Sequence, residues 1–290
     1  MPAIFRLLRP LQWLKNGFVF TPLIFSKHLF EKEYYVDAFL SFIVFCFASS
    51  LVYIINDIVD REGDKLHPNK KQRPIASGEI SIPFAAGISS FLALIVFVFA
   101  SFLPVYFQYA VLIYIILQLA YSFSLKHVVI LDLFIIAMGF MLRVFGGAFA
   151  IQVEISHWIV ITTLFLSLFL AASKRRSELV MIKKQHIETK RRVLQEYTVP
   201  FLDTLLIITT TGMAIAYSLY TMAERTIEVF NSEYLIFTTV FVVFGIFRYL
   251  FLVIVKEEGE NPTAILTTDM PTAINVLLWL ITCVSIIYFS

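Results

Sequence analysis

The chain has 290 residues, of which 59% are hydrophobic and only 15% are charged. Soluble domains carry about 25% charged residues, so this composition excludes an ordinary soluble protein and predicts an integral membrane protein. The mean hydropathy of +0.82 agrees with that prediction. The formal net charge of +2 is too small to indicate a nucleic-acid partner.

Nine apolar segments are candidate membrane-spanning helices, since a helix needs roughly 20 residues to cross the hydrocarbon core. In chain order they are Leu11–Ser26, Tyr35–Ile55, Ile82–Leu103, Tyr106–Phe123, Val128–Val153, Ser156–Ala172, Phe201–Met222, Tyr234–Val255 and Thr272–Tyr288. No soluble domain is inserted and no low-complexity linker divides the chain. We therefore expect an all-α fold in which residues 1–290 form one transmembrane domain.

Lysine and arginine are distributed unevenly among the connecting segments. Most of the 23 fall in the N-terminal arm and in the loops 56–81, 173–200 and 256–271. Cytoplasmic loops carry an excess of these residues, so the pattern predicts a cytoplasmic N-terminus and an extracytoplasmic C-terminus, most simply in the plasma membrane. The three that fall in segments expected outside are Lys27, Lys32 and Arg225.

Neither the cysteines nor the histidines indicate a metal site. Cys46 and Cys283 lie in separate apolar runs and are expected to be buried thiols. His67 and His127 lack metal-ligand spacing and are expected at the surface.

An acidic cluster follows the second apolar segment. On a helix at about 100° per residue, Asp57, Asp60 and Asp64 fall on one face. Three carboxylates this close repel one another unless a cation lies among them, and Mg²⁺ typically bridges a few carboxylates to substrate phosphates. With the neighbouring Asn56, this spacing predicts a Mg²⁺ site; the alternative is a solvated helix end. Tyr53, one turn earlier, would either hydrogen-bond the site or belong to an interfacial belt.

The stretch "NDIVDREGD" at 56–64, followed by "RPIASG" at 73–78, resembles the first aspartate motif of the UbiA superfamily of intramembrane prenyltransferases. The segment "RPLQWLKN" at 9–16 is also similar to that superfamily. The resemblance implies a bundle of nine helices around a cavity that opens to the cytoplasmic side, where Mg²⁺ and a diphosphate bind. It also implies substrate contacts for the matched polar residues, which are Lys15, Asn16, Asn56 and Arg73.

The second half of the chain departs from the commonest pattern of the superfamily. Its aromatic prenyltransferases carry a second aspartate-rich motif between the sixth and seventh helices, whereas "SKRRSE" at 173–178 contains no aspartate. Lysine and arginine bind phosphate oxygens without a metal, so we expect Lys174 and Arg175 to contact phosphate. Lys174 is preferred to Arg176 because it adjoins the helix end and can pair with Glu178. The alternative is an ordinary cytoplasmic cluster of positive charge.

Two segments resemble one branch of the superfamily in particular. The stretch from Tyr121 to Asp132, which includes Lys126, and the "SKRRSEL" block at 173–179 are similar to the decaprenyl-phosphate phosphoribosyltransferases. That branch uses phosphoribosyl diphosphate, which carries a 5-phosphate as well as a diphosphate. One carboxylate–Mg²⁺ site plus one cationic site would match such a donor. The resemblance implies phosphate or substrate contacts for Tyr121 and Lys126, with Asp132 positioning ribose or a metal.

The fifth apolar segment carries ionisable residues on one face. Asp132, Gly139, Arg143 and Gly146 fall within about 60° of one another. Ionisable residues inside a membrane helix usually face a bundle interior or a watery cavity, and glycines there let a neighbour approach closely. Arg143 is expected about 16 Å deeper than Asp132. A structural ion pair is the alternative for Arg143 and for Arg248 of the eighth segment.

These features favour a membrane transferase that moves 5-phosphoribose from phosphoribosyl diphosphate to a polyprenyl phosphate within the lipid bilayer. Mg²⁺ held by Asp57, Asp60 and Asp64 would neutralise the departing diphosphate. The lipid phosphate is already an anion and needs no general base. The closest alternative is prenyl transfer from a prenyl diphosphate to an aromatic or lipid acceptor. A lipid transporter or flippase is a further alternative, although the sequence shows no convincing internal repeat.

Overall fold

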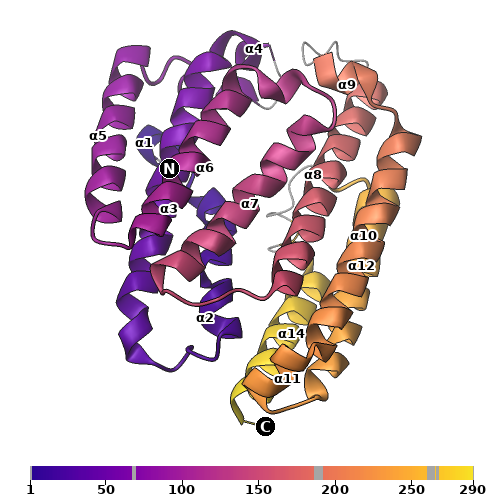
Figure 1. Ribbon diagram of the computed structural model, residues 1–290. Helices are drawn as coiled ribbons and strands as arrows, with labels where there is room; N and C mark the ends of the chain where they lie inside the picture. Colours follow the sequence, from indigo (N-terminus) through magenta and orange to yellow (C-terminus); the bar gives the residue numbers. More distant parts are fainter. Residues whose placement is uncertain (1, 67–69, 186–191, 260–264, 266–267, 290) are drawn as a thin grey trace. The chain divides into compact units, whose positions relative to one another are not determined.

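The computed structural model describes residues 2–66, 70–185, 192–259, 265 and 268–289 (Figure 1). Within these residues it is all-helical, with no strand. Eight described helices are long and apolar enough to cross a membrane by length and composition, which confirms the expected class of protein. His67 lies outside the described residues.

The long helices are α3 (Tyr35–Val59), α5 (Ile82–Ala100), α6 (Val105–Phe123), α7 (Leu131–Ala150), α8 (His157–Gln185), α10 (Val199–Met222), α12 (Thr239–Ile254) and α14 (Met270–Phe289). Short α-helices are α1 (Ala3–Leu8), α2 (Thr21–Phe25), α4 (Arg61–Lys65), α9 (Arg192–Glu196) and α11 (Glu224–Phe230). The 3₁₀ helices are η1 (Pro10–Phe20), η2 (Lys32–Tyr34), η3 (Lys70–Gln72), η4 (Leu125–His127) and η5 (Tyr234–Thr238).

The first of the nine expected spans is not a long α-helix. Its residues form η1 and then the five-residue helix α2. Pro22 lies inside this segment and lacks the backbone N–H that a continuous α-helix would use. Each of the other eight expected spans overlaps one of the eight long helices. The count of nine is therefore not reproduced among the described residues.

Two helices run further than hydropathy predicts. The helix α3 continues to Val59 and so carries Asn56 and Asp57 in its last turn. The helix α8 continues past Ala172 to Gln185, so Lys174, Arg175 and Arg176, which we call the cationic block, are helical. The added residues of α8 contain neither Pro nor Gly and are rich in Lys, Arg and Glu, which favour helix. Hydropathy marks the end of an apolar stretch, whereas the helix ends where its backbone hydrogen bonds end.

The chain divides into two compact units. The first comprises Met1–Leu23, Glu31–Ile135 and Leu142–Val153. In its core the ring of Phe45 packs edge-on against Phe107 and Tyr114, with centroids 5.9 and 5.6 Å apart. A Cβ atom on Gly146 would lie 2.6 Å from the Phe45 ring, and one on Gly147 would collide with the Val19 carbonyl. These glycines let η1 and α3 approach α7 closely, as the sequence predicts for Gly146.

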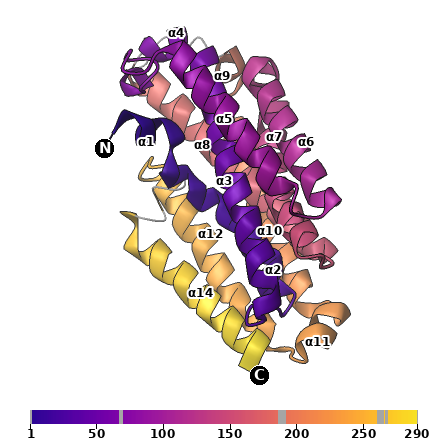
Figure 2. The same ribbon diagram turned by 90° about the vertical axis from the view of Figure 1, so that its left-hand side faces the viewer.

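The second unit comprises Ile24–Phe30, Ile136–Met141 and Glu154–Ser290. Within it α8 packs along α10 (Figure 1), and α12 lies beside α14 (Figure 2). The Tyr217 hydroxyl bonds Thr238 Oγ1 at 2.6 Å and accepts from Trp279 Nε1 at 2.9 Å. Cys283 is buried in the same apolar cluster. Cys283 and Cys46 are both buried free thiols, as expected.

Candidate functional site

The three motif aspartates follow one another from the last turn of α3 into α4. Asp57 belongs to α3, Asp60 stands between the helices, and Asp64 belongs to α4. Asp57 is 2% exposed and Asp64 is 5% exposed, whereas one third of the Asp60 side chain is exposed. Buried carboxylates are rare unless they are paired, so the partners of these groups define the site.

Three cations contact the three aspartates. Asp57 Oδ1 accepts from Arg9 Nη2 at 2.5 Å and from Arg73 Nη1 at 3.0 Å. Arg73 Nη1 also donates to Asp64 Oδ2 at 2.6 Å. Lys126 Nζ donates to Asp60 Oδ1 at 2.5 Å. The structure therefore brings five residues of the sequence-predicted site together, namely Asp57, Asp60, Asp64, Arg73 and Lys126. We call this group, with Arg9, the acidic cluster.

The acidic cluster has donor atoms of the kind that Mg²⁺ takes. Oxygens of Asp57 and Asp64 converge on one guanidinium nitrogen of Arg73, so the two carboxylates can meet at a single cation. Carboxylate oxygens are the protein ligands that Mg²⁺ prefers. In the part of the chain that the structure describes, no group of three or more His, Cys, Asp or Glu is arranged around a common metal position. Burial raises the pKa of the Asp64 carboxyl above its usual value, and Arg73 opposes that shift.

Arg9 is a site residue that the sequence analysis did not single out. It lies between α1 and η1 in the left-handed region, with φ 54° and ψ 57°. That conformation costs roughly 1 kcal/mol or more for a residue other than glycine. Its guanidinium stacks 5.1 Å from the centroid of the Tyr53 ring, so Tyr53 contacts the site through Arg9. The available signal was its place at the head of the "RPLQWLKN" segment, next to Lys15 and Asn16.

A second polar group surrounds Arg143 in the first unit. Arg143 is 5% exposed and donates from Nε to Asn16 Oδ1 at 2.6 Å and from Nη2 to the Tyr114 hydroxyl at 3.0 Å. Asn16 is fully buried and donates to Ser49 Oγ at 3.2 Å and to Cys46 Sγ at 3.3 Å. Hydrogen bonds of this kind satisfy a buried guanidinium. Arg143 thus faces the interior, as the sequence predicts.

Three further predicted residues of the first unit are buried or partly buried near the ends of helices. Asp132 is fully buried in the first turn of α7, where the helix dipole favours a negative charge. Asn56 and Tyr121 are partly buried in the last turns of α3 and α6.

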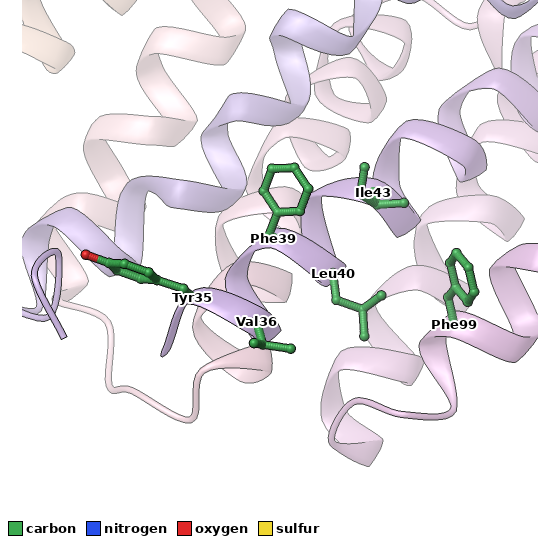
Figure 3. A pocket seen from close by; sticks show the side chains of 6 residues that line it. All are labelled: Tyr35, Val36, Phe39, Leu40, Ile43 and Phe99. Atoms are coloured by element: carbon green, nitrogen blue, oxygen red, sulfur yellow. The ribbon is translucent and has the colours of Figure 1, made fainter. Parts of the chain in front are cut away.

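A shallow apolar pocket lies elsewhere on the first unit (Figure 3). It is formed by the start of α3 and the end of α5 and is lined by Tyr35, Val36, Phe39, Leu40, Ile43 and Phe99. Because the acidic cluster lies at the other end of α3, this pocket is not part of it.

In the second unit the cationic block of α8 has acidic partners. Arg175 is 1% exposed and donates from Nη1 to Glu178 Oε2 at 2.7 Å. Arg176 donates from Nε to Asp203 on α10 and from Nη1 to the Val253 carbonyl on α12 at 2.9 Å. Arg176 therefore links three helices. Lys174 lies inside α8 and not at a helix end, so that ground for preferring it to Arg176 is wrong. A phosphate contact of Lys174 stays a prediction.

Arg248 forms a structural ion pair. Its Nε and Nη2 donate to the two carboxylate oxygens of Asp269 at 3.1 and 2.6 Å. Asp269 also accepts from the backbone N–H and the hydroxyl of Thr272. These hydrogen bonds hold the pKa of Asp269 well below its usual value, and those from Arg248 make the largest contribution. The ion pair considered as the alternative for Arg248 is therefore present.

Comparisons with known proteins agree with this fold. The sequence pattern of the UbiA prenyltransferase family matches residues 29–266, so the chain belongs to that family. A solved UbiA homolog from Archaeoglobus fulgidus, bound to GPP and Mg²⁺, superposes with a TM-score of 0.73 over 99% of both chains. At 22% sequence identity this likeness shows the fold alone.

Three relatives found by sequence share one name. The decaprenyl-phosphate phosphoribosyltransferase of Mycolicibacterium smegmatis is 32% identical, over 99% of this chain and 93% of the relative. The protein of the same name from Corynebacterium glutamicum is 34% identical over 75% of this chain and 67% of the relative. The protein of the same name from Mycobacterium tuberculosis is 27% identical over 99% of this chain and 95% of the relative.

Proposed function

We propose that this chain moves 5-phosphoribose from phosphoribosyl diphosphate to a polyprenyl phosphate, such as decaprenyl phosphate, and releases diphosphate in an Mg²⁺-dependent reaction. The observation that carries the proposal is the acidic cluster, in which buried carboxylates and cations lie within hydrogen-bonding distance of one another. Such a cluster offers oxygens to a metal and nitrogens to phosphate at one place. The relatives named decaprenyl-phosphate phosphoribosyltransferase support this donor and acceptor.

The transfer needs little covalent chemistry from the protein. An oxygen of the lipid phosphate bonds to the ribose C1 as the bond from C1 to the diphosphate breaks, and the diphosphate leaves with the electron pair. The lipid phosphate is an anion at neutral pH, so no general base is required. Mg²⁺, when bound, supplies positive charge to the departing diphosphate. Asp57, Asp60 and Asp64 would hold it.

The cations of the chain would orient the donor. Arg9, Arg73 and Lys126 already lie on the carboxylates and can reach phosphate oxygens bound beside them. We assign Lys174 and Arg175 to phosphate contacts in the second unit, and Asp132 to the positioning of ribose or metal. Tyr121 and Asn56 are proposed as further substrate contacts.

The proposal includes the membrane arrangement. Residues 1–290 would form one transmembrane domain whose substrate cavity opens to the cytoplasm, with the N-terminus on that side, in the plasma membrane. A reporter fused after Ser290 should then be accessible only from outside. A cytoplasmic reporter would overturn the orientation.

The reaction is tested with purified protein in lipid nanodiscs. Polyprenyl phosphate, Mg²⁺ and phosphoribosyl diphosphate labelled in the ribose should yield a labelled lipid whose mass is that of the polyprenyl phosphoribosyl phosphate. A parallel sample receives labelled prenyl diphosphate with an aromatic acceptor. Product in the second sample alone would favour prenyl transfer instead. Movement of lipid between leaflets without any covalent product would favour a flippase.

A further inference from the structure

Arg73 lies between two carboxylates of the acidic cluster, where a bridging metal ion would bind. Its Nη1 atom donates to Asp57 Oδ1 at 3.0 Å and to Asp64 Oδ2 at 2.6 Å. One positively charged group therefore joins two carboxylates that are almost completely buried. Carboxylate oxygens are also the protein ligands that Mg²⁺ prefers. The guanidinium and the metal consequently compete for the same oxygens.

The charges of the acidic cluster balance without a metal. Each of its three aspartates contacts a cation, and the cations also number three, so the formal charges of these six side chains sum to zero. Mg²⁺ added alone would leave a surplus of positive charge among partly and fully buried groups, which is costly. Mg²⁺ that binds together with a diphosphate is accompanied by negative charge. The acidic cluster should therefore accept the two ligands together.

The backbone of Arg73 is held in place, while its side chain is partly exposed. The Arg73 N–H donates to the Lys70 carbonyl at 3.0 Å, and the Arg73 carbonyl accepts from the Ser77 N–H at 2.8 Å. Ile75, two residues later, is 1% exposed and packs in an apolar cluster with residues of α3. The Arg73 side chain, by contrast, is 24% exposed. A change of side-chain rotamer can therefore move the guanidinium from the carboxylates to a phosphate group beside them.

A diphosphate gives the Arg73 guanidinium a suitable partner once a metal is bound. Arginine binds phosphate oxygens through two parallel N–H donors, whereas in the acidic cluster the single atom Nη1 contacts both aspartates. Mg²⁺ bound to the carboxylates would also repel the guanidinium. The metal and the diphosphate thus favour the same movement, and each contributes to it through its own contacts.

We propose that Arg73 occupies the Mg²⁺ position between Asp57 and Asp64 until the diphosphate binds, and that its guanidinium then moves to the diphosphate. The chain therefore binds Mg²⁺ weakly by itself and tightly together with a diphosphate. This rests on the proposed function, for which it specifies how metal and donor binding are coupled. Arg9 differs from Arg73, since among the described residues it contacts Asp57 and no other aspartate of the cluster.

Binding of Mn²⁺, a paramagnetic substitute for Mg²⁺, to the full chain in zwitterionic nanodiscs tests the first half of the proposal. Electron paramagnetic resonance of free Mn²⁺ gives the dissociation constant. Arg73→Met should bind Mn²⁺ at least about 10-fold more tightly than the wild type, because competing charged hydrogen bonds are lost. Arg9→Met should show a smaller gain, because the Arg73 bridge remains. Arg6→Met removes an exposed arginine that pairs with Glu79 in the same unit, and this matched control should bind Mn²⁺ as the wild type does.

Binding of radiolabelled inorganic diphosphate at saturating Mg²⁺ tests the second half. This probe does not depend on which group the diphosphate of the donor carries. Arg73→Met should bind it about 10- to 150-fold more weakly than the wild type, the range for loss of one charged hydrogen bond. Arg73→Lys should bind Mn²⁺ alone as weakly as the wild type does. It should recover only part of the diphosphate affinity, since an ammonium group lacks the planar fork.

Opposite changes in the two affinities distinguish this proposal from a structural role, in which Arg73→Met would weaken both or neither. Unfolding midpoints with and without Mn²⁺ show whether the variants are folded, and Mn²⁺ should raise the midpoint of Arg73→Met more than that of the wild type. Equal or weaker Mn²⁺ binding by folded Arg73→Met would overturn the proposal. If Arg73→Met does not fold, Arg73→Lys replaces it, and wild-type diphosphate affinity in that variant would overturn the proposal.

The outcome is separable from that of the proposed function. Opposite changes in metal and diphosphate affinity without any phosphoribosyl product would retain the exchange at Arg73 and reject the reaction. Phosphoribosyl product from the wild type, together with unchanged Mn²⁺ binding by Arg73→Met, would retain the reaction and reject the exchange.

Discussion

The acidic cluster of the first unit and the cationic block of the second unit use ion pairs in different ways. In the acidic cluster each aspartate meets a cation from another segment, and Arg73 is shared between Asp57 and Asp64. In the cationic block Arg176 is bonded to Asp203 and to a backbone carbonyl, so its charge holds helices together. Neighbouring charged residues in one motif can therefore have unequal roles, and the partner of each residue decides its role.

Substitution in the acidic cluster should have the largest effect. Asp57→Asn should lower phosphoribosyl transfer by at least about 100-fold, since it removes a metal ligand and an anchor for Arg9 and Arg73. Glu62→Gln is the matched control, because Glu62 is an exposed acid of α4 that pairs with Lys65. Initial rates in nanodiscs measure both. Comparable rates for Asp57→Asn and wild type would mean that the acids are only a solvated helix end.

Lys174→Ala should have the next largest effect. It tests whether the cationic block of the second unit binds phosphate. If Lys174 contacts donor phosphate, its loss should raise the apparent KM for phosphoribosyl diphosphate by about 10- to 150-fold. The KM for polyprenyl phosphate and the unfolding midpoint should change little. A normal donor KM would leave the cationic block with a purely structural role.

Arg176→Met should instead lower stability. The side chain of Arg176 is 8% exposed and that of Asp203 is 36% exposed, so loss of the pair should cost about 1–3 kcal/mol. Thermal unfolding of the purified protein measures this, with Arg176→Lys as the variant that keeps the charge. The KM values of the folded protein should stay normal. A raised donor KM without loss of stability would remove the distinction drawn between Arg176 and Lys174.

The smallest expected effect concerns pH. The folded pKa of Asp269 lies below its unfolded value, so the ion pair with Arg248 stabilises the fold fully above about pH 4. That contribution is lost as the pH falls through the folded pKa. The wild type should therefore lose more stability than Asp269→Asn between pH 5 and pH 3, both values being about one unit from the unfolded pKa. Unfolding midpoints across that range provide the measurement. Parallel curves for the two proteins would assign the pair no part in stability.

Hydropathy and motif spacing predicted much of the fold. Eight of the expected spans overlap long apolar helices because burial in lipid demands uninterrupted apolar residues. The first segment deviates because Pro22 interrupts it, and α8 extends because helix propensity continues after hydrophobicity ends. Local composition predicts where a stretch is apolar, but it does not predict the conformation of the backbone in that stretch.

Pairings between distant residues were harder to predict. Arg9 is 48 residues from Asp57, and Lys126 is 66 residues from Asp60, so no spacing within one helix links them. The acids themselves were recognisable from their spacing, although the expected single helix is interrupted at Asp60, which leaves Asp57 on α3 and Asp64 on α4. Asp203 and Asp269, the partners of Arg176 and Arg248, had no motif of their own. Only the packing of the helices assigns those partners.

The continuity of α3 has a consequence for the choice of lipid. This helix has 25 residues and is therefore about 37 Å long, several ångströms more than a typical hydrocarbon core of about 30 Å. Asp57 is fixed rigidly at its end, so its depth relative to the lipid headgroups follows the thickness of the bilayer. Longer acyl chains would draw the carboxylate toward hydrocarbon or force the helix upright. Reconstitution of this protein is therefore expected to depend on acyl-chain length, with thin bilayers keeping the end of α3 and its acidic cluster outside the hydrocarbon core.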